Sequence, residues 1–159
     1  ILASLWVGSQ SFEYDPELGL KFAKAADLAY CCPKNLEKWN CGKLCLDLQS
    51  TITYVNFVEK YSPYFDKVAY GVFRDDNSSQ LIFSFRGTNT VYQMFLESVF
   101  GKTIEYPFHS IPNATVDNTF SLRYQSLRDT FLKEITSIYE SYPNFTYVFT
   151  GHSLGAGLS

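Results

Sequence analysis

The chain has 159 residues, of which 46% are apolar and 18% charged, and its formal net charge is −3. A chain of this length and apolar content forms one folded domain, which excludes an intrinsically disordered protein. The mildly acidic charge, without a basic run, excludes a typical nucleic-acid-binding surface. No apolar run reaches the roughly 18 residues that a membrane-spanning helix needs.

The N-terminal segment, residues 1–11, reads ILASLWVGSQS and is apolar until its small and polar end. Two interpretations stay open for this segment: the remnant of a signal peptide, or an N-terminal packing arm. The remaining residues, 12–159, are assigned to the folded domain.

A helix is predicted from Pro16, because Asp15 can cap it and proline is tolerated at the first helical position. Its apolar face, spaced at intervals of three and four residues, comprises Leu18, Phe22, Ala25, Ala26 and Ala29. Pro33 prevents this helix from continuing. Residues 33–50 are predicted to form a polar loop held by cysteines.

Four cysteines lie close together in the sequence, at Cys31, Cys32, Cys41 and Cys45. Two are adjacent and no histidine is near, which does not fit a zinc site. Disulfide bonding in a secreted or lumenal protein fits better, and three pairings are open. Three glycosylation sequons favour the same compartments, lysosome and vacuole included, and they begin at Asn77, Asn113 and Asn144.

Strands are predicted at residues 51–58, 67–74 and 81–85, because these segments are rich in β-branched and aromatic residues. Turn-forming residues between the last two predict a hairpin. A short amphipathic helix is predicted at 91–100. Residues 101–118 are predicted to be irregular, with short strand-like pieces.

The longest helical pattern covers residues 119–141, with Tyr124, Leu127, Phe131, Ile135 and Ile138 on one face. An apolar strand is predicted at 145–150. A long helix before such a strand favours a crossover connection and an α/β fold whose sheet is covered on both faces.

This last strand leads into Gly151-His152-Ser153-Leu154-Gly155, which fits G-x-S-x-G. In that pattern a nucleophilic serine occupies a sharp strand-to-helix turn. The glycines at 151 and 155 are needed because larger side chains would block the turn. The oxyanion formed by such a serine needs hydrogen-bond donors. The backbone N–H of Leu154 and that of Thr88, in Phe85-Arg86-Gly87-Thr88 at another strand end, are the candidates.

Together these two motifs resemble the class 3 (fungal-type) triacylglycerol lipase family of the α/β-hydrolase fold. Residues 20–31 are similar to that family's first helix with its Tyr-Cys ending, and residues 39–45 to the Cys-rich loop of its secreted members. The resemblance implies that Ser153 is the nucleophile and that Thr88 and Leu154 form the oxyanion hole. It also implies a lid within 88–100, with an apolar face of Val91, Met94, Phe95, Val99 and Phe100.

A serine hydrolase also needs a histidine base and a carboxylate, which follow the serine in chain order in this fold. Residues 154–159 contain neither. His152 is interpreted as a packing or hydrogen-bonding residue, and His109 lies ahead of the turn in an irregular segment. We therefore expect this chain to be the N-terminal part of a longer enzyme, cut just after the nucleophile turn and inactive by itself.

The sequence thus predicts a serine ester hydrolase of triacylglycerol-lipase type that acts through an acyl-enzyme at a lipid–water interface, without cofactor or metal. A phospholipase, galactolipase or feruloyl esterase of the same fold is one alternative. A non-catalytic lipid-binding relative is another. The third is an unrelated β–α domain in which the serine turn has no catalytic role.

Overall fold

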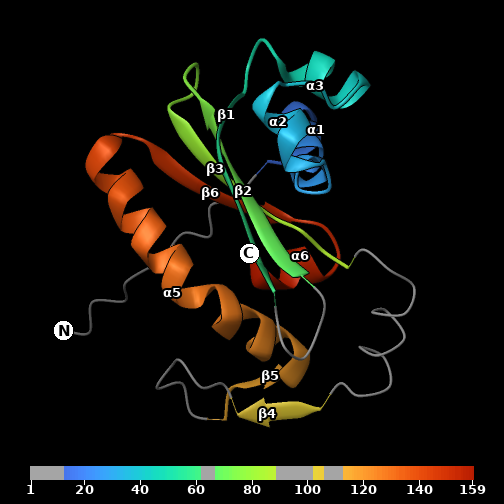
Figure 1. Cartoon of the computed structure of the whole chain (residues 1–159), viewed down its shortest axis with the longest axis vertical. Coiled ribbons are helices and arrows are strands. Elements are labelled where there is room, and N and C mark those ends of the chain that lie inside the picture. The colour runs from blue at the N-terminus through green and yellow to red at the C-terminus, as the bar shows by residue number, and fades with distance from the viewer. Residues whose placement is uncertain (1–12, 62–66, 89–101, 106–112) are drawn as a thin grey trace, which may run out of the picture.

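A computed structural model describes residues 13–61, 67–88, 102–105 and 113–159 (Figure 1). The first part of this chain forms three helices and three strands: α1 (Pro16–Leu28), α2 (Pro33–Glu37), α3 (Lys43–Leu48), β1 (Thr53–Tyr61), β2 (Lys67–Asp75) and β3 (Gln80–Phe85). The second part forms β4 (Thr103–Glu105), β5 (Thr115–Asp117), α5 (Asn118–Ser141), β6 (Thr146–Gly151) and α6 (Leu154–Leu158). The calls on residues 1–11 and on the helix at 91–100 lie outside the described residues.

The main sheet has the strand order β1–β2–β3–β6. The first three strands pair antiparallel, and β6 joins β3 in parallel with Phe85 opposite Gly151. Parallel neighbours need a crossover connection, and α5 supplies it. The predicted hairpin and the predicted crossover are both confirmed. The strand-like pieces expected between 101 and 118 are β4 and β5, which form a separate antiparallel pair.

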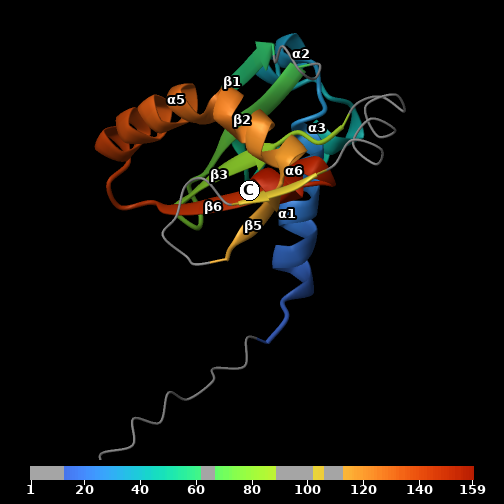
Figure 2. The same cartoon turned by 90° about the horizontal axis from the view of Figure 1, so that it is seen from below.

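Helices cover both faces of the main sheet, with α5 on one face and α1, α2 and α3 on the other (Figures 1 and 2). Side chains of β3 alternate between these faces, as a strand requires. Leu81 and Phe83 belong to the core cluster that includes Phe131 of α5. Ile82 belongs to the second cluster, with Leu28 of α1. The sheet therefore separates two apolar cores.

The two long helices follow their predicted patterns closely. The carboxylate of Asp15 caps α1 by accepting hydrogen bonds from the backbone N–H groups of Glu17 (2.9 Å) and Leu18 (3.1 Å). In the predicted apolar face of α1, Ala25, Ala26 and Ala29 are buried, Phe22 is half-buried and Leu18, near the start, is 40% exposed. In α5, the buried apolar residues are Leu127, Phe131 and Ile138.

The prediction of a polar loop at residues 33–50 is wrong, because α2 and α3 lie within that range. Leu36, Cys45 and Leu48 are buried and belong to the core cluster on the α1 side of the sheet. Short helices depend on such tertiary packing, since a few residues carry too little intrinsic propensity to be recognised from local sequence. Pro33, which ends the preceding helix, is the first residue of α2.

The four cysteines, all within the described part of the chain, are thiols, so the predicted disulfide is absent from this structure. Cys31 and Cys45 lie near Cys41. Burial raises the pKa of the Cys41 thiol, and its two neighbouring thiols raise it further. Cys32 is exposed.

A buried ion pair joins α1 to the β2–β3 turn. Asp75 is 3% exposed and pairs with Lys21, which also donates to the side-chain oxygen of Gln80 at 2.8 Å. Asp75 also accepts hydrogen bonds from the backbone N–H groups of Asn77 (2.8 Å) and Ser78 (3.2 Å). Burial by itself would raise the pKa of Asp75, but Lys21 and Ser78 hold it below its usual range.

We predict that Asp75→Asn lowers the free energy of unfolding by about 2–3 kcal/mol near neutral pH, because Lys21 loses its buried counter-charge. The folded-state pKa of Asp75 is lowered, so its contribution is fully present above the unfolded-state pKa of about 3.9. It is lost as the pH falls through the folded-state pKa. Urea unfolding at a series of pH values should therefore show the variant approaching the wild type below about pH 4.

Asp76→Asn is the matched control. Asp76 pairs with Arg74 at 2.8 Å, but its side chain is 60% exposed. A surface pair of this kind contributes less than about 1 kcal/mol. Equal destabilisation by the two substitutions would contradict the role given to Asp75.

Candidate active site

Two motif-bearing turns meet because β3 and β6 are parallel neighbours. Phe85 and Gly151 lie opposite one another at the carboxyl ends of these strands. Gly87 lies two residues after Phe85, and Ser153 lies two residues after Gly151. Both turns therefore lie at the same edge of the sheet. Ligands of open α/β sheets bind at this edge. Ser153 is exposed there, whereas Gly87 is buried and Thr88 half-buried.

The backbone is strained at the serine. Ser153 has φ 57° and ψ −123°, a conformation that residues with a side chain rarely adopt. Helix α6 begins at the next residue. Gly155 N–H donates to the carbonyl of His152, and Ala156 N–H donates to that of Ser153, both at 3.0 Å. A strand, one residue with positive φ and a helix thus follow one another at the pentapeptide.

The turn tolerates only glycine at the positions where its parts cross. A Cβ atom on Gly155 would lie closer than 3.0 Å to the carbonyl oxygen of Phe85, and one on Gly151 would lie as close to the backbone of Gly155. Real Cβ atoms essentially never show such separations. The ends of β3 and β6 and the start of α6 can therefore approach only through these glycines.

Of the two candidate oxyanion donors, Leu154 directly follows Ser153, and Thr88 directly follows the residue that approaches it, Gly87. Leu154 is the first residue of α6, where a backbone N–H has no partner within the helix. Thr88 follows Gly87, and a Cβ atom on Gly87 would lie 3.3 Å from Cβ of Ser153. The two turns therefore approach each other at Gly87, the residue directly before Thr88. The expected lid residues Val91, Met94, Phe95, Val99 and Phe100 lie outside the described residues.

Arg86 anchors the Gly87 turn to the rest of the sheet. Its backbone N–H donates to the carbonyl of Ala69 at 2.9 Å, and its guanidinium donates to Glu59 at 3.1 Å and to the carbonyl of Lys67 at 3.4 Å. Lys67 lowers the pKa of Glu59, burial works against it, and Arg86 lowers it further. In the sequence Arg86 stands out only as one residue of the motif, and no local pattern indicates this role.

Tyr30, just beyond the end of α1, contacts both turns. Its hydroxyl oxygen accepts a hydrogen bond from Gly87 N–H at 3.1 Å and lies 3.1 Å from Nδ1 of His152. The rings of Tyr30 and His152 pack edge to face, 6.0 Å apart. The interpretation of His152 as a hydrogen-bonding residue agrees with this contact. The role of Tyr30 could not be predicted from the sequence, where its only signal is the Tyr-Cys ending of the first helix.

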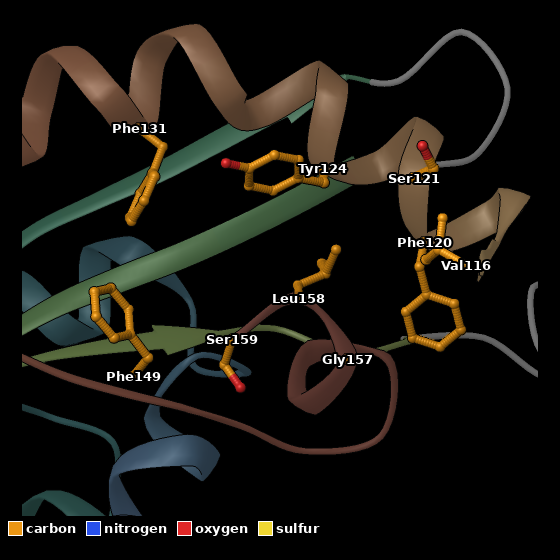
Figure 3. A pocket seen from close by; sticks show the side chains of 9 residues that line it. All are labelled: Val116, Phe120, Ser121, Tyr124, Phe131, Phe149, Gly157, Leu158 and Ser159. Atoms are coloured by element: carbon orange, nitrogen blue, oxygen red, sulfur yellow. The ribbon is translucent and has the colours of Figure 1, made fainter. Parts of the chain in front are cut away.

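An apolar pocket of about 380 Å³ opens between α5 and α6 (Figure 3). It is lined by residues of β5, α5, β6 and the chain end, namely Val116, Phe120, Ser121, Tyr124, Phe131, Phe149, Gly157, Leu158 and Ser159. No histidine or carboxylate is among them, so this pocket supplies no base for Ser153. Within the described ranges, no cluster of three or more metal-ligating side chains occurs.

Comparisons with known proteins agree with the resemblance seen in the sequence. Residues 82–159 match the model of the family described as lipase (class 3). A lipase from Rhizopus microsporus var. chinensis is 22% identical with a TM-score of 0.71, over 87% of this chain and 46% of that one. The nonglycosylated LIP2 lipase of Yarrowia lipolytica is 22% identical with a TM-score of 0.76, over 89% and 51%.

Lipase II from Rhizopus niveus is also similar, at 22% identity and a TM-score of 0.70, over 87% of this chain and 50% of that one. The expected α/β-hydrolase fold is therefore confirmed, and residues 82–159 carry the class 3 lipase pattern. The chain spans about half the length of these lipases.

We predict that Gly155→Ala lowers the free energy of unfolding by about 3 kcal/mol or more, because the added methyl group must push α6 away from Phe85. Urea or thermal unfolding would measure the effect.

Gly19→Ala makes the same chemical change within α1 and serves as the control. The only close neighbour of its added methyl group is the ring of Tyr14, which is 76% exposed and can rotate away. Alanine is favoured over glycine in a helix by up to about 1 kcal/mol, so this variant should be as stable as the wild type or more stable. If Gly155→Ala were as stable as the wild type, the close packing of α6 against Phe85 would be contradicted.

Proposed function

We propose, from the class 3 lipase character of residues 82–159, that the protein is a serine ester hydrolase acting on lipids such as triacylglycerols. The observation that carries this proposal is Ser153, with φ 57° on a strand-to-helix turn and a second, glycine-containing turn against it. A solved structure with a TM-score of 0.72 and 18% identity is described as a triacylglycerol lipase whose catalytic centre is a serine protease triad.

In this proposal Ser153 Oγ attacks the carbonyl carbon of the ester. The negative charge that develops on the carbonyl oxygen is held by the backbone N–H groups of Leu154 and Thr88. The alcohol leaves with a proton, and the acyl group stays on Ser153 until water hydrolyses it. Gly151 and Gly155 allow the serine turn to form.

The proton transfers need a histidine and a carboxylate. His152 is engaged with Tyr30 at 3.1 Å, and residues 154–159 offer neither type of side chain. In this fold the acid and the histidine follow the serine along the chain. We therefore assign both to residues beyond Ser159, so that residues 12–159 are the first part of the catalytic domain.

Residues 88–100 are assigned to a lid that covers the site in water and opens at a lipid surface. The support is the helical spacing of their apolar residues, which would give one face able to contact lipid. Such a lid makes an emulsified or membrane-bound ester the preferred physical form of the substrate.

A secreted or lumenal protein fits the surface features. The asparagines of all three sequons, Asn77, Asn113 and Asn144, are exposed in the structure. Cys31 and Cys45 lie near enough to Cys41 to raise the pKa of its thiol, so that an oxidising compartment would join it to one of them. Among the described helices, none is long and apolar enough to cross a membrane.

Ser153→Ala tests the proposed reaction. In the protein produced from its complete reading frame, it should lower kcat on emulsified triacylglycerol by at least about 10⁴-fold, because the nucleophile is lost. Labelling by a fluorophosphonate should disappear as well. The 159-residue chain by itself should not turn over, because the proposed base and carboxylate lie beyond Ser159.

Ser141→Ala, at the end of α5, is the control and should leave both readouts unchanged. The same assay with phospholipid, galactolipid and feruloyl esters would identify an alternative substrate. A wild-type protein that turns over none of these esters and resists the fluorophosphonate would favour a non-catalytic lipid-binding relative.

The compartment has its own test. Peptide mapping of the natural protein by mass spectrometry should find glycans on the sequon asparagines and a disulfide that includes Cys41. Glycosidase treatment should remove the added mass of the glycans, and reduction should separate the peptides that the disulfide joins. Four free thiols together with unmodified asparagines would contradict secretion.

A further inference from the structure

The hydroxyl of Tyr30 connects three parts of the molecule that are distant in the chain. It follows α1, yet it contacts Gly87, 57 residues later, and His152, 122 residues later. Its oxygen lies 3.1 Å from Gly87 N, 3.1 Å from His152 Nδ1 and 3.5 Å from the carbonyl oxygen of His152. One oxygen atom is therefore shared by the two turns of the candidate active site.

The direction of the bond with Gly87 is fixed by its chemistry, whereas the direction of the bond with His152 depends on the histidine tautomer. A backbone N–H can only donate, so the oxygen of Tyr30 accepts from Gly87. The hydrogen of the hydroxyl is then free to point at His152, whose Nδ1 accepts when the ring proton is on Nε2. Burial raises the pKa of Tyr30, partly offset by the Gly87 hydrogen bond, so the hydroxyl keeps this hydrogen at neutral pH.

Gly87 is where such a bond has the greatest effect. A Cβ atom at this position would lie closer than 3.0 Å to both the hydroxyl of Tyr30 and the carbonyl of His152, so glycine is required there. Glycine is also the residue with the most backbone freedom. The close approach thus places the most flexible residue type directly before Thr88, and the hydrogen bond that Gly87 N–H donates to the Tyr30 hydroxyl restricts it.

The bond also determines which amides can act on the substrate. Gly87 N–H is committed to Tyr30 and is not a donor for an oxyanion. The neighbouring amide of Thr88 is the next along the turn. On the other side, His152 immediately precedes the strained Ser153, and its carbonyl accepts the first hydrogen bond of α6.

We propose that Tyr30 is a positioning residue whose hydroxyl holds the Gly87 turn against the His152 turn, and so sets the distance between the Thr88 amide and Ser153 Oγ. This inference rests on the proposed ester hydrolase function. A displacement of about 1 Å at such a site lowers the rate by about 10²-fold.

Tyr30→Phe removes the hydroxyl and keeps the ring. In the protein produced from its complete reading frame, it should lower kcat on a soluble ester by about 10- to 100-fold while KM changes less than about twofold. A merely structural role would instead reduce the melting temperature and the amount of active protein, as shown by active-site titration, and leave kcat per titrated site unchanged. That second result would overturn the inference.

The acceptor side is tested through His152. His152→Asn keeps a side-chain acceptor near the position of Nδ1, whereas His152→Leu removes it. The Leu variant should lose more kcat than the Asn variant, and it should cause little further loss when Tyr30 is already Phe. Fully additive losses would show that the two residues act separately and would overturn the inference. Tyr139→Phe, on α5 with a side chain that is 60% exposed, is the control and should match the wild type.

Amide hydrogen exchange at Gly87 separates this inference from the proposed function, because it needs no substrate. Loss of the Tyr30 hydroxyl should speed exchange of that amide by about tenfold. Unchanged exchange would overturn the proposed contact even if the enzyme is active. A wild type without ester turnover would instead contradict the proposed function, and the exchange rate would still decide whether Tyr30 holds the turn.

Discussion

The parallel pairing of β3 with β6 is the constraint on which the candidate site depends. Phe85 opposite Gly151 brings the two strand ends level, and Gly155 seats the start of α6 directly on the carbonyl of Phe85. A slip of one residue would turn Leu81 and Phe83 away from the α5 core, because strand side chains alternate between faces. The same register therefore determines both the core and the meeting of the two turns.

The turns themselves carry strain and flexibility, so their geometry depends on outside supports. Ser153 is held at positive φ by the strand before it and the helix after it. The Gly87 turn is fixed from two directions. Arg86 binds this turn to Glu59 of β1 and Ala69 of β2. Tyr30, just beyond the end of α1, binds it from the other direction. Three separate elements thus converge on two short turns.

Much of this architecture could be read from local sequence. The cap at Asp15 is a signal of a few residues, whereas the hairpin strands and the long helix to Ser141 each repeat a pattern over many residues. The structure follows all three. The helices within residues 33–50 could not be predicted from the sequence, because they are only five and six residues long and are stabilised by packing with Phe73 and Ile82 of the sheet. Patterns this short carry little information about packing.

What the sequence determined by itself is the set of chemical parts and their order: a serine between two glycines after an apolar strand, and a Gly-Thr pair after an earlier one. These are local features, because a strand-to-helix turn requires its small residues within five positions. Only the tertiary structure decided how the parts are held. The contacts of Tyr30 span 57 and 122 residues, and those of Arg86 and Glu59 span 27. Interactions of this kind depend on the strand register and leave no periodic trace along the chain.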